Sequence, residues 1–169
     1  MKWIGISGSR LLTTKEVRDD VYREVRQTLA RGDGIVTGGA IGVDQFATEE
    51  AVLNETFGNK IKICLPTTFD IFAKHYRKRA DEGVITQDEA ENLIALLEKV
   101  KEANPEAIIE STTYVVCDKE SYYARNGTIV DLSDEVYAFQ VNGSGGTQDT
   151  IDQAILQGKE VKHFVYKIA

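Results

Sequence analysis

Three glycine-rich turns carry the residue types best suited to chemistry in this chain. Residues 142–150 read Asn-Gly-Ser-Gly-Gly-Thr-Gln-Asp-Thr and connect an apolar run at 136–141 to a predicted helix. The other turns lie at residues 5–10 and 37–44, each at the end of an apolar segment. Backbone N–H groups in such turns, helped by the dipole of a following helix, bind anions. The sequence therefore predicts one site for a nucleotide or another phosphorylated small molecule.

The predicted site combines backbone groups with a few side chains. Arg10 and Arg125 are expected to pair with phosphate, because a guanidinium forms charge-assisted hydrogen bonds to it. Asp44 and Asn126 are expected to set the geometry of the turns or to contact ribose or base. No catalytic residue is assigned. The predicted ligand-binding residues are Gly8, Ser9, Arg10, Gly38, Gly39, Ala40, Gly42, Asp44, Arg125, Asn126, Ser144, Gly145, Gly146 and Thr147.

Each motif also has a purely structural interpretation, which the sequence leaves open. The turn at residues 5–10 can be a plain connection from strand to helix, and the small residues at 38–42 can serve tight packing. Arg125 can be a solvated residue on an ordinary helix. Thr147 and Thr150 can each cap the helix that follows them.

The composition is typical of a soluble globular protein and indicates one domain over residues 1–169. Hydrophobic residues make up 42% and charged residues 28% of the chain. The net charge of −7 disfavours broad binding to nucleic acid, which depends on a basic surface. A small anionic ligand bound by a few local cations is compatible with that charge. The basic run at residues 74–79 can be a solvated helical face, and His163 is expected to be structural.

The two cysteines and the apolar segments indicate the cellular compartment in which we expect the protein. Cys64 and Cys117 are far apart, lie in apolar context and lack the spacing of a metal site, so we expect two buried thiols. No apolar run approaches the ~20 residues that span a bilayer, and the N-terminal residues have no secretory pattern. We therefore expect a cytoplasmic protein with no membrane contact and no metal site. The identity of any cofactor stays open.

Apolar segments alternate with amphipathic ones, which predicts a single doubly wound α/β domain with a mainly parallel, Rossmann-like sheet. The predicted strands are residues 3–7, 35–36, 60–65, 112–117, 135–141 and 160–166. The predicted helices are one capped by Thr14 and those at 43–57, 87–103, 119–132 and 148–157, whereas residues 67–85 show no regular pattern. Ligands bind at the carboxyl edge of such sheets. We therefore expect Gly8, Gly39 and Gly146 to face a common cleft at that edge.

Three motifs follow one another in a recognisable order. Gly-Gly-Ala-Ile-Gly-Val-Asp occupies residues 38–44, Arg-Asn-Gly-Thr-Ile and then Leu-Ser-Asp fall within 125–134, and Gly-Thr-Gln-Asp-Thr occupies 146–150. In this order they resemble the Rossmann-like domain of the DNA-processing protein A (Smf) family, over about residues 3–166. The wider superfamily includes molybdenum-cofactor carrier proteins, the lonely-guy phosphoribohydrolases and nucleotide-sensing domains. The resemblance implies a nucleotide-type ligand and assembly into homo-oligomers.

Three functions stay open, and binding of a nucleotide or nucleotide derivative without catalysis is the leading prediction. The second is a nucleotide N-glycosidase or phosphoribohydrolase, for which Asp44 or Asp149 would supply the carboxylate. Against it, the phosphoribohydrolases have Pro and a catalytic Glu where this chain has Asn142 and Thr150. The third is a recombination accessory protein that binds single-stranded DNA through a basic groove, which the acidic charge disfavours.

Overall fold

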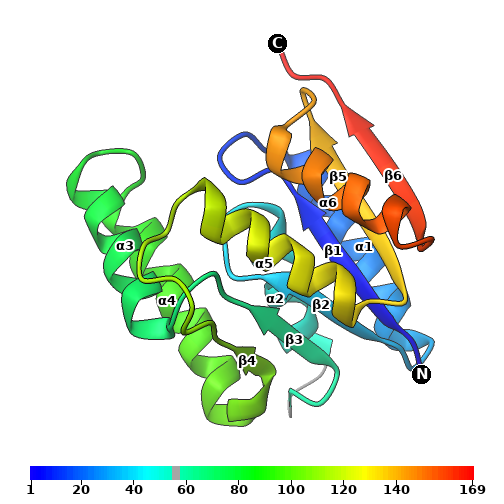
Figure 1. The fold of residues 1–169 in the computed structure, drawn as a ribbon, viewed down its shortest axis with the longest axis horizontal. Coiled ribbons are helices and arrows are strands. Elements are labelled where there is room, and N and C mark those ends of the chain that lie inside the picture. The colour runs from blue at the N-terminus through cyan, green and yellow to red at the C-terminus, as the bar shows by residue number, and fades with distance from the viewer. Residues whose placement is uncertain (55–57) are drawn as a thin grey trace.

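A single parallel sheet with helices on both faces forms the core of the computed structural model (Figure 1), which describes residues 1–54 and 58–169. The strands are β1 Trp3–Gly8, β2 Gly34–Gly38, β3 Ile61–Cys64, β4 Ile108–Ile109, β5 Glu135–Val141 and β6 Glu160–Tyr166. The helices are α1 Lys15–Ala30, α2 Val43–Asn54, α3 Phe69–Asp81, α4 Gln87–Ala103, α5 Lys119–Leu132 and α6 Gly145–Leu156, with a short 3₁₀ turn at Pro105–Ala107.

The strand order is β4-β3-β2-β1-β5-β6, and every neighbouring pair is parallel. The chain starts at the central β1, moves outward to β4, and then returns to the other side of β1 to form β5 and β6. Helices α5 and α6 cover one face, and α1 and α2 cover the other (Figure 1). The predicted doubly wound α/β fold is confirmed. The reversal of direction between β1 and β5 is the switch point where such sheets bind ligands.

Buried aliphatic residues explain why the strands form where they do. The aliphatic side chains of β1 and β2, among them Ile4, Ile6 and Ile35, are fully buried, as expected for strands covered on both faces. On β5, Phe139 is fully buried and stacks on Phe164 of β6 with ring centroids 4.5 Å apart. Both cysteines are buried and free, as predicted.

Polar residues cap the starts of several helices, and the observed helix bounds agree with the predicted ones in most places. Thr14 caps α1 by accepting a hydrogen bond from the backbone N–H of Val17. Thr86 and Glu89 form a reciprocal capping box at the start of α4, whose bounds match the prediction. The predicted helix at 43–57 is observed as Val43–Asn54, and its last three positions lie outside the described residues.

Three local interpretations of the sequence were wrong. Residues 67–85 contain a regular helix, α3, because Thr68 caps it and Phe69, Phe72 and Tyr76 form a buried stripe between the basic residues. Residues 112–117 form no strand, and the edge strand is instead the two-residue β4. Helix α6 starts at Gly145, so Thr147 and Thr150 lie inside it and do not cap it.

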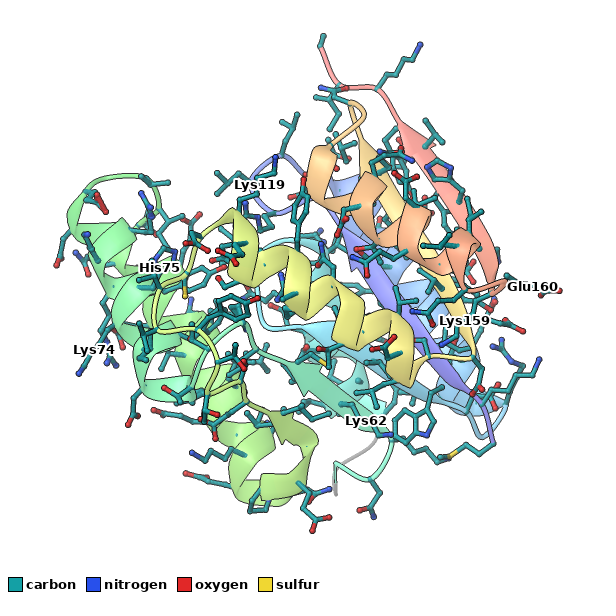
Figure 2. All side chains as sticks on the ribbon, in the orientation of Figure 1. Lys62, Lys74, His75, Lys119, Lys159 and Glu160 are labelled. Atoms are coloured by element: carbon teal, nitrogen blue, oxygen red, sulfur yellow. The ribbon has the colours of Figure 1, made fainter. Side chains whose placement is uncertain are left out.

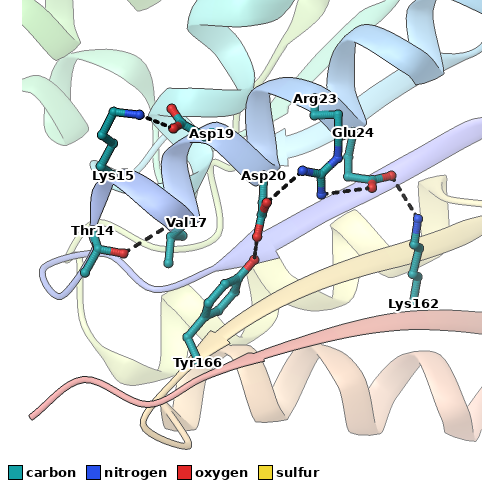
Figure 3. Close-up of polar contacts among 9 residues, drawn as sticks. All are labelled: Thr14, Lys15, Val17, Asp19, Asp20, Arg23, Glu24, Lys162 and Tyr166. Carbon is teal, nitrogen blue, oxygen red and sulfur yellow. Dashed lines mark hydrogen bonds and ion pairs between the residues drawn. The ribbon is translucent and has the colours of Figure 1, made fainter.

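The edge strand β6 is attached to α1 by polar side chains (Figure 3). The hydroxyl of Tyr166 donates to Asp20 at 2.7 Å, and the ammonium group of Lys162 lies 3.0 Å from the carboxylate of Glu24. Arg23 contacts both acidic residues. These contacts supplement the ladder of β5 and β6 on the face opposite α6.

Across the described ranges 1–54 and 58–169, no helix combines the length and hydrophobicity that crossing a bilayer requires. The same residues contain no group of three or more His, Cys, Asp or Glu side chains placed to bind a metal ion.

Candidate functional site

A cleft of about 760 Å³ opens at the carboxyl edge of the sheet, at the switch point between β1 and β5. Ser7 and Gly8 at the end of β1 and Val141 at the end of β5 form its floor. Helices α3 and α5 and the start of α6 contribute its walls. This is the edge at which the sequence predicted a ligand.

The structure brings most of the predicted site residues together and leaves one group apart. The residues that line the cleft are Gly8, Ser9, Arg10, Asp44, Arg125, Asn126, Ser144, Gly145, Gly146 and Thr147. The turn after β2 reaches the cleft through Ile41 and Asp44, whereas Gly38, Gly39, Ala40 and Gly42 are not among its lining residues. Gly8 and Gly146 therefore share the cleft as expected, and Gly39 does not.

Packing explains the small residues of the turn after β2. A methyl group on Gly39 would lie 2.5 Å from Leu65 and 3.3 Å from Phe72, so Gly39 faces the core. Gly42 has a positive φ of 83° and lies against the backbone carbonyls of Ser9 and Arg10. Contact of this turn's glycines with a ligand stays a prediction.

Arg125 on α5 is a buried cation at the wall of the cleft, with 7% of its surface exposed. Its Nε donates to Oδ1 of Asn126 at 3.3 Å, and its Nη1 donates to the backbone carbonyl of Cys64 at 3.4 Å. A guanidinium has five N–H donors. The described residues accept hydrogen bonds from two of these N–H groups. The remaining N–H groups of this buried cation lie at the cleft wall, where an anion can accept hydrogen bonds from them.

Asn126, the next residue on α5, connects Arg125 to the third glycine-rich turn. Its side-chain amide donates to the carbonyl of Gly146 at 3.3 Å and to the carboxylate of Asp149 at 3.1 Å. Gln153 donates to the same Asp149 oxygen at 2.8 Å. Asp149 is thus a structural acceptor and is not among the cleft-lining residues.

Asp44 is a buried carboxylate in the cleft wall, held by its own turn. Oδ1 accepts from the hydroxyl of Thr37 at 3.0 Å, and Oδ2 accepts from the backbone N–H of Ala40 at 3.3 Å. Burial raises the pKa of the Asp44 carboxyl, and the nearby Arg125 guanidinium opposes that rise. Gly38 makes their proximity possible, because any Cβ there would overlap both Arg125 and Asp44.

Tyr122 contacts both of the predicted phosphate-binding arginines. The guanidinium carbon of Arg10 is 4.7 Å from the centroid of the Tyr122 ring, and that of Arg125 is 5.3 Å from it. His75 of α3 meets the same ring edge-on, with centroids 6.4 Å apart. Figure 2 shows His75 on the side of α3 that faces the start of α5. Burial, and then the charges of Arg79 and Arg10, lower the pKa of His75.

The third glycine-rich turn forms the first turn of α6. Asn142 and Gly143 have positive φ values of 49° and 64° and reverse the chain after β5. The hydroxyl of Ser144 donates to that of Thr147 at 2.9 Å and makes no capping bond to the helix. Apart from its chain neighbours and the backbone of α6, no described atom lies within 4 Å of the position of a Cβ on Gly146, so this turn is open to the cleft.

Several cleft residues were missed from the sequence. They are the cations Arg79 and Lys119, the ring of Tyr122, and the apolar residues Leu11, Leu12, Val84 and Ile85. A usable signal existed for Tyr122, since a residue three positions before Arg125 on a helix lies on the same face. Arg79 came from the stretch without a recognised helix, so no argument placed it near the turns.

The structure defines a Rossmann-like α/β domain with a cleft at its switch point. The chain belongs to the DNA recombination-mediator protein A family, whose model matches residues 1–169. The resemblance inferred from the three motifs is thereby confirmed. A search of curated protein sequences gives no match.

Solved structures share this fold at low sequence identity. DNA processing protein A from Helicobacter pylori, described for its single-stranded DNA binding mode, is 24% identical over 97% of this chain, with a TM-score of 0.70. The Streptococcus pneumoniae protein is 22% identical over 95%, with a TM-score of 0.65. This chain spans 64% and 49% of those two chains. A molybdenum cofactor binding protein from Rippkaea orientalis is 18% identical over 99% of this chain and 77% of its own length, with a TM-score of 0.59.

Proposed function

We propose that this chain binds a nucleotide or another phosphorylated small molecule in the cleft between β1 and β5, without catalysis of its own. The observation that carries the proposal is Arg125, a buried guanidinium in the cleft wall with two of its five donors satisfied by the described residues. A buried cation is stabilised by an anion that accepts its remaining hydrogen bonds.

The charge of the cleft supports an anionic ligand. Its lining contains the cations Arg10, Arg79, Lys119 and Arg125, against the carboxylates of Asp44 and Asp118. Both carboxylates already accept backbone N–H groups, from Ala40 and Ser121 respectively. A local excess of positive charge in a chain of net charge −7 favours a ligand that is small enough to stay within the cleft.

The shape and lining of the cleft fit a nucleotide. The lining combines polar groups of the first turn of α6 and the two arginines with apolar residues such as Leu11, Leu12 and Val84. Those three side chains are 66%, 43% and 48% exposed, and an apolar or aromatic part of a ligand would cover them. A phosphate and a base would thereby each find complementary groups in one cleft.

Binding without catalysis is supported by the position of the carboxylates. Thr150, where the phosphoribohydrolases have Glu, is fully buried and donates its hydroxyl to the carbonyl of Gly146. Asp149 lies outside the cleft lining, which leaves Asp44 and Asp118 as the carboxylates an enzyme could use, and each already accepts a hydrogen bond from a backbone N–H group. If the chain is a nucleotide hydrolase, incubation with nucleoside monophosphates releases free base, and Asp44→Asn abolishes that release.

Single-stranded DNA is the second candidate ligand, because the family model covers the whole chain and the Helicobacter pylori relative binds it. Calorimetric titration with AMP and ADP, beside a gel shift with an unstructured oligonucleotide at low and high salt, separates the two. We expect saturable nucleotide binding that Arg125→Ala weakens, and weak oligonucleotide binding that salt removes. Tight oligonucleotide binding with no nucleotide binding contradicts the proposal and selects the second candidate.

A further inference from the structure

The ring of Tyr122 is the point at which three segments of the chain bring nitrogen-rich side chains together. Arg10 comes from the turn after β1, His75 from α3, and Arg125 from α5 itself, three residues after Tyr122. The phenol oxygen of Tyr122 is buried and has no hydrogen-bond partner among the described residues. The contacts of Tyr122 with these three side chains are made by its ring.

Contact with an aromatic face restricts a guanidinium that would otherwise move freely. Arg10 is an exposed residue, and its guanidinium lies over the ring of Tyr122. A cation over a tyrosine ring gains about 0.5–2 kcal/mol. That contact holds the guanidinium of Arg10 against the same ring that Arg125 contacts before any ligand arrives, which lowers the entropic cost of binding.

Two guanidinium groups at one place favour a particular kind of phosphate. Each guanidinium binds best when it donates to two oxygens. A terminal phosphate has three such oxygens and a charge of about −1.5 to −2 at pH 7. A phosphodiester has two free oxygens and a single charge, so it can satisfy one of the two groups fully but not both.

We propose that Tyr122 is a positioning residue, whose ring aligns Arg10 and Arg125 into one site for a terminal phosphate group. The inference rests on the proposed function and names its ligand class, a phosphomonoester. An internal phosphate of a nucleic-acid strand is the disfavoured ligand. Neither the Tyr122 hydroxyl nor a metal ion is needed for this selection.

The test compares AMP, 3′,5′-cyclic AMP and adenosine by calorimetric titration. The three share a base and differ in phosphate charge and in the number of free oxygens. We expect AMP to bind at least about tenfold more tightly than cyclic AMP, with adenosine weaker than both; tenfold corresponds to about 1.4 kcal/mol. Tyr122→Leu should weaken AMP binding more than cyclic AMP binding, whereas Tyr122→Phe keeps the ring and should retain the preference of the unaltered chain.

Arg10→Ala is the second variant. Because Arg10 is exposed, this variant should fold even if Tyr122→Leu does not. It should remove the preference for AMP in the same way, and combining it with Tyr122→Leu should cost less than the sum of the two single losses. Equal affinity for AMP and cyclic AMP overturns the inference and leaves the proposed function in place. Equal weakening of both ligands by Tyr122→Leu also overturns it. Failure of all three compounds to bind overturns the proposed function as well.

Discussion

Asn126 accepts a hydrogen bond from Nε of Arg125 at 3.3 Å, and this contact fixes the plane of a buried guanidinium. The amide nitrogen of the same Asn126 donates to Gly146 and Asp149 of α6. Neighbouring residues on α5 therefore link the cation of the cleft to the glycine-rich turn on the other side. A shift of that turn on ligand binding would therefore displace Arg125 through the side chain of Asn126.

Arg125→Ala should weaken nucleotide binding by roughly 10- to 150-fold, because a hydrogen bond to a charged group contributes about 1.5–3 kcal/mol. The sequence left open an exposed Arg125 whose loss would spare the fold. At 7% exposure, with acceptors on Asn126 and Cys64, its loss should also lower the free energy of unfolding by about 1–3 kcal/mol. Calorimetry and urea denaturation measure the two effects.

Arg77→Ala is the matched control, since Arg77 is an exposed cation paired with Glu91. It should leave both quantities nearly unchanged. Unaltered nucleotide affinity in Arg125→Ala would remove this residue from the site.

Asn126→Ala tests the positioning contact. The variant keeps the charge of Arg125 and removes the acceptor of its Nε, so nucleotide affinity should fall by less than in Arg125→Ala. A positioning contact whose loss costs about 0.5–1.5 kcal/mol corresponds to roughly 2- to 13-fold. A loss as large as that of Arg125→Ala would instead indicate that Asn126 contacts the ligand directly.

Gly38→Ala should lower the free energy of unfolding by about 1–3 kcal/mol, since overpacking a close-packed site has that cost. The added methyl would overlap Arg125 and lie 2.5 Å from Oδ2 of Asp44, so one of the two must move. Gly146→Ala is the matched control, because its methyl meets no described atom within 4 Å. Urea denaturation compares the two, and equal stabilities would show that Arg125 and Asp44 adjust without cost.

The fold could be predicted because its signals are local and repeated. Strands such as β1 and β5 are apolar along their length, and Thr14 and the charged helix α4 have clear boundaries. Helix α3 was missed because its buried stripe is interrupted by the basic run at 74–79, whose charges dominate the local pattern. Residues 112–117 have strand propensity but no neighbouring strand to pair with, which only the tertiary structure decides.

The site was predicted in part for a related reason. A glycine-rich turn after a strand indicates a place at the carboxyl edge, and ten of the predicted residues line the cleft. The sequence cannot tell a glycine that approaches a ligand from one that approaches Leu65 and Phe72, as Gly39 does. It also cannot place α3 beside α5, and so the contact of His75 with Tyr122 could not be predicted.

Tyr166→Phe should destabilise the chain by about 0.5–1.5 kcal/mol at neutral pH, through loss of the hydrogen bond to Asp20. Burial, and then the hydrogen bond to Asp20, raise the pKa of Tyr166 above its ordinary value of 10. A raised pKa in the folded state gives stability that is full below pH 10 and is lost as pH rises above it. The unaltered chain should therefore lose stability more steeply above pH 10 than Tyr166→Phe does. Parallel pH dependences of the two, measured by urea denaturation, would contradict the role of this contact.

Gly146→Val tests whether the first turn of α6 meets the ligand. Its backbone φ is not positive and its surroundings are open, so a valine there should fold with a native circular dichroism spectrum. The branched side chain would occupy the cleft next to Ser144 and Thr147, where we expect phosphate to accept backbone N–H groups. Loss of one charge-assisted bond lowers affinity by roughly tenfold or more. Gly146→Ala, with a single methyl, should have a smaller effect in the same calorimetric titration. If valine leaves the affinity unchanged while the fold is intact, this turn does not touch the ligand and the phosphate binds nearer to Arg10 and Arg125.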